Sequence, residues 1–406
     1  MKILHTADWH LGKRLEGRSR LPEQMAVLDE ICGIAETHKV DVVLIAGDLY
    51  DHFNPATEAI DLFYRTLKRL SRGGCCAVVA IAGNHDSPEM IEVPHPLAKE
   101  CGIVMVGFPN SLVKPFETTE GVEVTKSTSG FIELALPDVE FPLRLVLTPY
   151  ANEVRLKKSL SEDKEADLRK LLEEHWQRLA TTYCDQKGVN ILMAHLFFSD
   201  NKAKQKELLE LEGEGERSIL VGGASSIFTE NIPSEIQYTA LGHLHRYQNL
   251  AKKDQSPIIY SSSPLCYSFA EANQEKYVCV LNAKPNAKIE VEKIGLKEGK
   301  RLLRKTFLTE EEACEWLEQN QNTWVEISLH TDTFLDGQIR KKLHSLHEGI
   351  VNLIPILNEK ELGDAEYDLQ QLDMTQDIES LFAAYFYQKN QLPISDELKE
   401  IFREIL

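Results

Sequence analysis

The sequence has no apolar run approaching the roughly 20 residues that a membrane-spanning helix requires, and no apolar segment of the signal-peptide type follows Met1. It also has no Cys-x-x-Cys pair, because its eight cysteines are scattered at positions 32, 75, 76, 101, 184, 266, 279 and 314. This spacing argues against a disulfide framework and favours a reducing compartment. We therefore expect a cytoplasmic protein.

Positive charge is scarce in the chain. Its 45 lysines and arginines face 64 aspartates and glutamates, which gives a formal net charge of -19. A protein that holds DNA by bulk electrostatics needs a surplus of Lys and Arg, because these residues neutralise phosphates and release counterions. Any nucleic-acid substrate would therefore have to be held locally, with the help of metal ions, or together with a partner.

The 406 residues are too many for one ordinary hydrophobic core, so two or three domains are expected. Short apolar runs alternate with stretches of helical periodicity in the first part of the chain. We expect helices over residues 22–35, 55–70 and 165–179. We expect strands over residues 3–5, 40–46, 77–82, 131–136, 143–147, 189–194, 238–241, 258–261 and 277–281. This rhythm predicts an α/β fold in which helices cover a buried parallel or mixed sheet.

The pattern changes after residue 282, so residues 1–282 are expected to form the first domain. Residues 283–358 predict a small α+β domain with strands over 289–294, 302–307, 324–329 and 350–357. Its first helix is opened by a capping box, Thr309 to Glu312, and its second spans residues 337–346. An acidic linker is expected over residues 359–376.

Two amphipathic helices are expected in residues 377–406. Their apolar faces either pack back onto this chain or bind a partner, and the position after an acidic linker favours a partner. The candidate partner-binding residues are Leu381, Phe382, Tyr385, Phe386, Leu398 and Phe402. The helix over residues 55–70 also has more apolar surface than one face needs, which fits either core packing or self-association.

Five polar clusters, most of them directly after an apolar strand, carry the chemistry. In extended chain, residues i and i+2 point the same way, so the two polar residues of a D-x-H or H-x-H motif can face one ion. The carboxyl ends of strands in an α/β sheet form the edge where ligands gather. Glycines at 47, 83 and 242 would let the backbone turn sharply beside the ligands. The candidate metal ligands are Asp8, His10, Asp48, Asn84, His195, His243 and His245.

These seven residues predict a site for two metal ions. A mixed nitrogen and oxygen shell suits Mn, Zn or Fe better than Mg. Two ions roughly 3.5–4 Å apart can activate a water and hold phosphate oxygens. His85 stands beside Asn84 and is free to act on the leaving oxygen as an acid or charge stabiliser, and Asp86 is expected to orient the His85 imidazole.

Each cluster also has an ordinary structural explanation. A strand-end Asp or His commonly caps a turn, and Asn and Asp are frequent turn residues. His195 alone fits a structural histidine. The occurrence of all five clusters in this order on strand ends favours the metal site.

The set D-x-H, G-D-x-x-D, G-N-H-D, H and G-H-x-H resembles that of the calcineurin-like metallophosphoesterase superfamily. Residues 5–13 and 17–20 resemble more narrowly the bacterial SbcD family of nuclease subunits, and so do residues 264–269 and the terminal helix pair. The resemblance covers essentially the whole chain and is most specific over residues 1–110 and 190–275.

The resemblance implies a four-layer α/β/β/α phosphoesterase core with two Mn²⁺ ions, a capping domain and a C-terminal helix pair. One ion would take Asp8, His10, Asp48 and His245. The other would take Asp48, Asn84, His195 and His243, and His85 would be the catalytic histidine.

The family further implies a homodimer through the nuclease domain, with the terminal helices docked on the coiled-coil root of an SbcC-type ATPase. Such complexes act as exonucleases and endonucleases on DNA ends and hairpins in repair and recombination. Two positions depart from the pattern. Ser262 stands where relatives often carry Gly, and His52 follows Asp51, the position at which some relatives have histidine; Asp51 and His52 stay outside the catalytic set.

Four basic residues follow the first metal motif: Lys13, Arg14, Arg18 and Arg20. They either hold the DNA backbone near the ions or belong to a solvated loop. For the whole chain, the alternative functions are a phosphoesterase acting on small phosphoesters or cyclic nucleotides, and a non-catalytic scaffold on the same fold. The presence of all seven candidate ligands argues against the scaffold.

Overall fold

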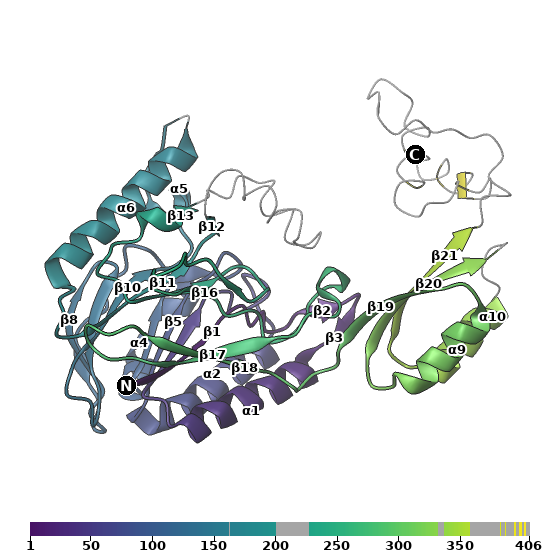
Figure 1. The fold of residues 1–406 in the computed structure, drawn as a ribbon, viewed down its shortest axis with the longest axis horizontal. Coiled ribbons are helices and arrows are strands. Elements are labelled where there is room, and N and C mark those ends of the chain that lie inside the picture. Colours follow the sequence, from purple (N-terminus) through teal and green to yellow (C-terminus); the bar gives the residue numbers. More distant parts are fainter. Residues whose placement is uncertain are drawn as a thin grey trace. The chain divides into compact units, whose positions relative to one another are not determined.

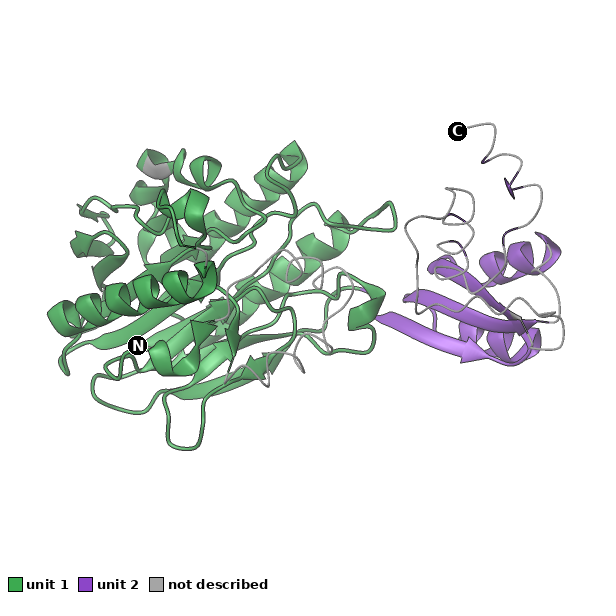
Figure 2. Cartoon of the chain, turned by 90° about the horizontal axis from the view of Figure 1, so that it is seen from above, with its two compact units in different colours: residues 1–299 green, residues 300–406 purple. Residues whose placement is uncertain are grey.

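The computed structural model describes residues 1–161, 163–199, 227–331 and 337–357, together with Phe382, Phe386, Ile394, Leu398, Lys399 and Phe402. The chain divides into two compact units, residues 1–299 and 300–406 (Figure 2). All eight cysteines are free thiols. Among the described helices, none is both long and apolar enough to cross a membrane.

The first unit contains a six-stranded sheet in the order β18-β17-β1-β4-β5-β6. Four of these strands are parallel: β1 (Lys2–Thr6), β4 (Val42–Ala46), β5 (Ala77–Ile81) and β6 (Ile103–Val106). On the other side of β1, β17 (Tyr277–Asn282) and β18 (Glu290–Gly295) are antiparallel. Every residue of β4 and β5 is buried, as expected for strands that are covered on both faces.

An eight-stranded sheet, ordered β15-β16-β14-β11-β10-β9-β8-β7, lies in the same unit. Its central strands β16 (Ile258–Tyr260), β14 (Tyr238–Gly242), β11 (Val189–His195) and β10 (Leu143–Thr148) are parallel. The flanking strands are antiparallel: β15 (Gln248–Asn249), β9 (Phe131–Ala135), β8 (Glu123–Thr128) and β7 (Phe116–Glu117).

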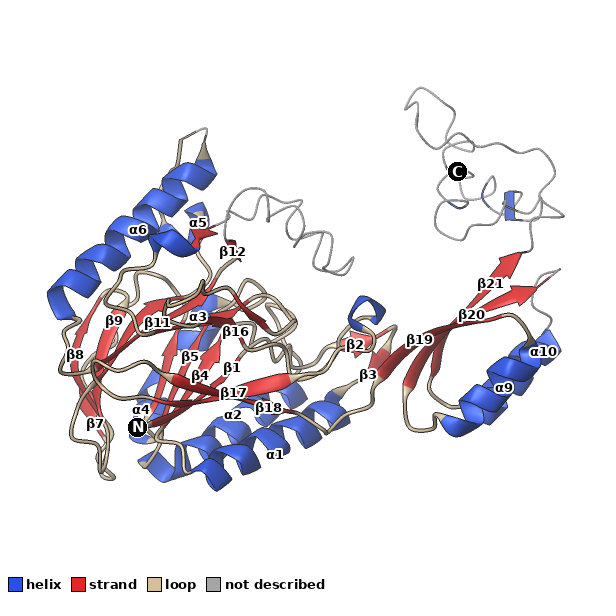
Figure 3. Ribbon diagram, viewed as in Figure 1, coloured by secondary structure: helices blue, strands red, loops and turns tan. Residues whose placement is uncertain are grey.

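The two sheets pack face to face, with helices on both outer faces (Figures 1 and 3). Leu44 of β4 and Leu145 of β10 belong to the same buried cluster between the sheets. The outer face of the first sheet packs on α1 (Leu21–His38) and α2 (Thr57–Ser71), and that of the second sheet packs on α6 (Lys164–Tyr183). These layers confirm the predicted α/β class and the α/β/β/α order.

Shorter elements complete the first unit. A hairpin, β2 (Arg14–Leu15) and β3 (Arg18–Ser19), follows the first polar cluster. The remaining elements are η1 (Arg72–Gly74), α3 (Pro88–Glu92), α4 (His95–Glu100), α5 (Glu153–Leu156), β12 (Phe198–Ser199), β13 (Ile227–Phe228), η2 (Thr229–Asn231) and η3 (Phe269–Glu271).

The second unit has a parallel three-stranded sheet of β19 (Leu302–Phe307), β20 (Trp324–Thr331) and β21 (Ile350–Leu357). Helices α9 (Glu310–Gln319) and α10 (Gly337–Leu346) connect these strands and pack on them around Ile327 and Leu343. The hydroxyl of Thr309 caps α9 by accepting the backbone N–H of Glu312 at 3.3 Å, as the sequence predicts.

The structure corrects the assignment of residues 289–294 to the second domain. This segment forms β18, which pairs with β17 along its whole length, from Tyr277↔Gly295 to Asn282↔Glu290. The first unit therefore extends to Gly299. A half-exposed strand pattern does not reveal which sheet an edge strand joins, and this is why the predicted boundary falls too early.

The predicted linker over residues 359–376 lies outside the described residues, as do Leu381 and Tyr385. Of the terminal apolar residues, the rings of Phe382 and Phe402 stack with centroids 3.9 Å apart, and the ring of Phe386 lies 6.3 Å from that of Phe382. Residues from the two expected helices thus contact each other.

Candidate metal centre

The seven candidate ligands lie at the carboxyl ends of five parallel strands. Asp8 and His10 follow β1, Asp48 follows β4, and Asn84 follows β5. In the other sheet, His195 ends β11 and lies opposite Gly242, the last residue of β14; His243 and His245 follow. The sheets meet here, since His195 Nδ1 donates to the carbonyl of Ala46 at 2.8 Å. Residues up to 237 positions apart in the sequence, from Asp8 to His245, are thus brought to one edge.

Asp48 lies between the two groups of histidines. Its Oδ1 accepts the backbone N–H of His85 at 2.9 Å. Its Oδ2 lies 3.5 Å from His10 Nε2 and 3.3 Å from His195 Nε2. One carboxylate oxygen therefore faces ligand atoms from both sheets.

The first group comprises Asp8, His10 and His245, whose ligand atoms lie within 4.8 Å of one another. The Nε2 atoms of His10 and His245 are 3.0 Å apart. Asp8 Oδ1 accepts the backbone N–H of His243 at 2.8 Å, whereas its Oδ2 is buried and has no hydrogen-bond partner among the described groups.

The second group comprises Asp48, His195 and His243, again within 4.8 Å. Asn84 Oδ1 lies 3.0 Å from both His195 Nε2 and His243 Nδ1. The Nδ1–H of His195 donates to Ala46, and its Nε2 faces Asp48 and Asn84.

This donor set fits a pair of divalent cations. Two imidazole nitrogens at 3.0 Å can share at most one proton, and a buried carboxylate oxygen without a partner carries a desolvation cost. A cation in each group would satisfy these atoms, and the mixture of imidazole, carboxylate and amide donors suits Mn, Zn or Fe.

Burial and charge set the protonation of these groups. Burial raises the pKa of Asp8 to about 7 and lowers the pKa of His243 to about 3 and that of His10 to about 4. Burial also acts to lower the pKa of His195, but the nearby Asp48 carboxylate outweighs it and raises this pKa to about 9. Burial also acts to raise the pKa of Asp48, but the neighbouring His195 outweighs this effect and holds the pKa of Asp48 well below its usual value.

Four of the seven residues have a left-handed backbone: Asp8 (φ 55°), His10 (φ 43°), Asp48 (φ 47°) and His243 (φ 105°). Side chains with a Cβ seldom adopt this conformation, which costs on the order of 1–3 kcal/mol per residue. The surrounding strands hold these turns in place through bonds such as Asp8 N–H to Gly47 O at 2.9 Å.

The glycines beside the ligands serve close approach as well as turning. Gly47 has φ +92° and makes the predicted sharp turn. Gly83 and Gly242 do not have a positive φ. A Cβ on Gly83 would lie 2.0 Å from Asp48 Oδ1, and one on Gly242 would lie 1.8 Å from Ala46 O. The prediction of a sharp turn is therefore wrong for Gly83 and Gly242. Glycine is required at these two positions because a Cβ would clash with Asp48 or Ala46.

Comparison with known proteins identifies the family. A model of the family described as calcineurin-like phosphoesterase matches residues 1–247. The chain is 32% identical to the SbcD subunit of the SbcCD nuclease of Bacillus subtilis (strain 168), with 100% of this chain and 97% of the relative covered.

The chain belongs to the SbcD family of calcineurin-like phosphoesterases. It is similar to the SbcD subunits of two further SbcCD nucleases. That of Rhodobacter capsulatus is 32% identical, covering 70% of this chain and 66% of the relative, and that of Escherichia coli (strain K12) is 27% identical, covering 86% and 83%. Membership makes the chain a nuclease subunit and a phosphodiester hydrolase that depends on divalent metal ions.

His85 of this SbcD-family chain lies beside the first ligand group. Its ring is half-buried and edge-on to that of His10, with centroids 4.8 Å apart. Its Nδ1 lies 2.9 Å from the carbonyl oxygen of Asp51. When Nδ1 carries the proton and donates to this carbonyl, Nε2 is left available to exchange a proton with another group.

The structure corrects the role predicted for Asp86. Its buried carboxylate accepts three backbone N–H groups, from Gly83 at 2.8 Å, Leu49 at 3.0 Å and Tyr50 at 2.9 Å. Asp86 therefore ties the loop after β4 to the loop after β5, while the His85 imidazole is oriented by Asp51. Burial raises the pKa of Asp86 to about 6. The sequence places Asp86 next to His85, but adjacent side chains point apart.

The basic residues of the first loop do not act as one group. Arg20 is fully buried, where it pairs with Glu23 at 2.6 Å and donates to the carbonyl of Cys266 at 2.9 Å, so the prediction that it contacts DNA is wrong. Lys13 Nζ donates to Asp51 at 2.9 Å, next to the candidate site. Arg14 is exposed and donates to Gly17 in the β2–β3 hairpin, and Arg18 is half-buried in the same hairpin.

Arg155 supports the ligand loops, and the sequence does not reveal this role. From α5, its guanidinium donates to the carbonyls of Gly83 and Asp86, each at 2.7 Å. It is buried and also lies over the ring of Tyr150, 5.1 Å from the centroid. Because both partners are backbone carbonyls of a loop distant in the sequence, no local motif indicates the contact.

Tyr267 and Gln24 hold the loop that carries His10. The Tyr267 hydroxyl donates to the carbonyl of Trp9, and its ring lies edge-on to His10 at 5.5 Å. Gln24 of α1 donates to the carbonyl of His10 at 2.8 Å and accepts the N–H of Gly12 at 3.0 Å. Tyr267 falls within residues 264–269, which resemble the SbcD family, and that resemblance could have pointed to it.

Ser262, which replaces a frequent Gly, keeps the backbone that Gly would favour. Its φ is +80°, and its hydroxyl accepts the N–H of Tyr277 at 2.9 Å. This hydrogen bond ties the turn at Ser262 to the start of β17.

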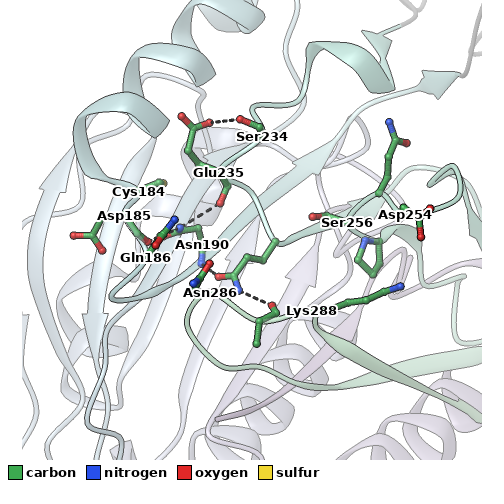
Figure 4. A pocket seen from close by; sticks show the side chains of 14 residues that line it. Cys184, Asp185, Gln186, Asn190, Ser234, Glu235, Asp254, Ser256, Asn286 and Lys288 are labelled. Atoms are coloured by element: carbon green, nitrogen blue, oxygen red, sulfur yellow. Dashed lines mark hydrogen bonds between the residues drawn. The ribbon is translucent and has the colours of Figure 1, made fainter.

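Figure 4 shows a cavity of about 650 Å³ that is lined by none of the candidate ligands. It is lined by residues at the amino-terminal ends of β11, β14 and β16, among them Asn190, Gln237 and Pro257. The candidate ligands lie at the opposite, carboxyl ends of β11 and β14. The cavity is therefore separate from the candidate metal centre.

Proposed function

We propose that this chain is the Mn²⁺-dependent DNA nuclease subunit of a repair and recombination complex, with double-strand exonuclease and single-strand or hairpin endonuclease activity. The proposal is supported by membership of the SbcD family. The observation that carries it is Asp48 Oδ2, which faces His10 Nε2 and His195 Nε2 from two different sheets. We infer a cytoplasmic site of action from the free cysteines.

We propose two ligand sets, which the grouping of the side chains supports. We assign Asp8, His10, Asp48 and His245 to one ion, and Asp48, Asn84, His195 and His243 to the other. When bound, such cations polarise phosphate oxygens and lower the pKa of the attacking water. The preference for Mn²⁺ over Mg²⁺ rests on the four imidazole nitrogens in these sets.

We assign His85 as the residue that protonates or stabilises the leaving oxygen. Its half-exposed ring stands beside the first ligand group, and its Nδ1 lies next to the Asp51 carbonyl. Among the predicted DNA-binding residues, Lys13 pairs with Asp51 beside the site, and Arg14 is the most exposed. We therefore assign phosphate contacts to Lys13, Arg14 and Arg18, and not to Arg20.

An SbcC-type coiled-coil ATPase is the partner that this assignment requires. The relatives are named as subunits of SbcCD, and a net charge of -19 leaves much of the grip on DNA to another protein. We assign partner binding to the terminal apolar residues, of which Phe382 and Phe402 stack on each other. We further propose a homodimer through the first unit.

Digestion of a blunt-ended duplex in Mn²⁺, with and without the ATPase, tests the catalytic role. We expect His85→Ala to lower the rate about 10²–10⁴-fold, the range for loss of a general acid, without changing Mn²⁺ binding. His344→Ala, an exposed histidine of α10, is the matched control and should cut like the wild type.

Equal cutting by His85→Ala and the wild type would remove the role given to His85. Hydrolysis of a small phosphomonoester by a protein that leaves the duplex intact would instead show that the substrate assignment is wrong. A purified chain that binds no divalent ion would favour the scaffold alternative.

A further inference from the structure

A buried ion pair lies behind His245, outside every motif of the metal centre. Glu271 of η3 and Lys276 are both buried, with Glu271 Oε2 and Lys276 Nζ 2.5 Å apart. Burying two charges is unfavourable unless hydrogen bonds satisfy them. Replacing a buried ion pair by apolar residues often leaves a protein equally stable, so stability alone does not explain this pair. Its contacts with neighbouring residues indicate a further role.

The described hydrogen bonds of the pair converge on His245 and its surroundings. Lys276 Nζ donates to the carbonyl of His245 at 2.8 Å and to Ser263 Oγ at 3.0 Å, in addition to Glu271. Glu271 Oε1 lies 3.3 Å from His245 Nδ1 and accepts the backbone N–H of Tyr267 at 3.2 Å. The pair thus holds His245 at its ring and at its backbone.

The other candidate histidine ligands are oriented differently. His195 Nδ1 donates to the backbone carbonyl of Ala46, and His243 faces Asn84 through Nδ1 itself. His10 Nδ1 lies 3.6 Å from Asp51, too far for a hydrogen bond. The Nδ1 of His245 lies 3.3 Å from a carboxylate, closer than the Nδ1 of His10 at 3.6 Å or that of His195 at 3.8 Å.

We propose that Glu271 is a positioning residue that holds His245 in the Nδ1–H tautomer with its Nε2 lone pair directed at the metal centre, and that Lys276 holds Glu271 in place. A carboxylate on the outer nitrogen of a ligand imidazole fixes its rotation and increases its basicity, and loss of such a partner typically weakens metal binding 10–100-fold. The inference rests on the proposed function, since it assigns His245 to one of the two ions.

Mn²⁺ titration of the full-length chain, with free Mn²⁺ followed by electron paramagnetic resonance, tests this role. The wild type should bind two ions. Glu271→Gln keeps the size of the side chain but removes the charge, and we expect one of its two sites to be weakened 10–100-fold while the other keeps its affinity.

Glu133→Gln is the matched control, because Glu133 is also a buried carboxylate in an ion pair, with Arg144 at 2.8 Å, but contacts none of the candidate ligands. This variant should bind both ions with wild-type affinity. Wild-type affinity at both sites of Glu271→Gln would overturn the inference alone. Absence of bound Mn²⁺ in the wild type would overturn the proposed function and this inference with it.

A second measurement needs no folded Glu271 variant. In the metal-free wild type labelled with ¹⁵N at its 13 histidines, the ring nitrogen shifts of His245, assigned with His245→Asn, report the tautomer. Nδ1–H supports the role of Glu271, and Nε2–H overturns it.

Discussion

At the scale of single residues, the centre depends on how closely backbone can approach a carboxylate. Gly83 lies so near Asp48 that an added Cβ would be 2.0 Å from Oδ1 and 2.2 Å from the backbone nitrogen. Backbone cannot move away as a flexible side-chain end can. The carboxylate that faces both ligand groups is therefore placed by the absence of a side chain at residue 83.

We expect Gly83→Ala to displace Asp48 and to weaken Mn²⁺ binding at both sites at least tenfold, measured by the same titration. Gly33→Ala in α1 is the control, because an added Cβ there meets nothing within 4 Å. It should keep both sites and raise the free energy of unfolding by about 0.5–1 kcal/mol, since Ala favours a helix over Gly. Wild-type Mn²⁺ affinity in Gly83→Ala would contradict the claim that the close approach of Gly83 to Asp48 positions the Asp48 carboxylate.

The sequence predicts the seven candidate ligands because each stands at the end of a strand or within four residues after it, where spacing carries information. Glu271 could not be predicted, because it lies 26 residues from His245 and only the fold brings them together. Arg20 shows the opposite error: a basic residue in a basic loop looks available to DNA, and its burial against Glu23 and Cys266 appears only in three dimensions. Local sequence patterns therefore predict the metal ligands better than they predict the residues that position those ligands.

At the scale of elements, a row of charges crosses three strands of the second sheet. Glu133 of β9 stands opposite Arg144 of β10 and Lys126 of β8, and bonds Arg144 at 2.8 Å and Lys126 at 2.8 Å. Burial acts to raise the pKa of Glu133, but hydrogen bonds from Lys126 and Arg144 outweigh it and lower the pKa. Such cross-strand pairs stabilise the antiparallel part of the sheet.

We expect Glu133→Gln to lower the free energy of unfolding at pH 7 by about 1.5–3 kcal/mol, the range for hydrogen bonds to charged groups. Because the folded pKa of Glu133 is depressed, its contribution is present above the unfolded pKa of about 4.3 and is lost as the pH falls through the folded pKa. Urea denaturation from pH 7 to pH 3 should therefore show the two proteins converging at acid pH. A constant difference would mean that the charge plays no part.

Elements with a strong apolar period are predictable within a few residues, for example the helix from Pro22, observed over 21–38. Short or half-exposed elements are not. The β2–β3 hairpin and α5 are too short to show a period, and β8 has only one fully buried residue in six. The sequence predicts the strand β18 but not which sheet this strand joins, because strand pairing is decided by tertiary contacts.

At the scale of the whole molecule, all the candidate ligands belong to the first unit. Metal binding should therefore stabilise that unit alone, by an amount that depends on concentration and affinity. A ligand at 100 times its Kd adds about 2.7 kcal/mol per site.

Calorimetry of the full chain in EDTA and in Mn²⁺ measures this effect. We expect the transition of residues 1–299 to rise by about 5 °C per site, while the transition of the second unit stays where it is. Variant Asp48→Asn should remove most of the shift. A shift of both transitions, or of neither, would contradict the assignment of the ligands to the first unit.

The division of each ligand group between two sheets has a consequence for synthesis of the protein. Asp8 and His10 emerge first from the ribosome, but their partner His245 follows more than 200 residues later, and the β17 strand that pairs with β1 later still. A chain interrupted anywhere before residue 245 lacks at least one donor of the proposed first ion site. Nascent or truncated copies that end before residue 245 are therefore expected to lack a complete first ion site and to cut no DNA.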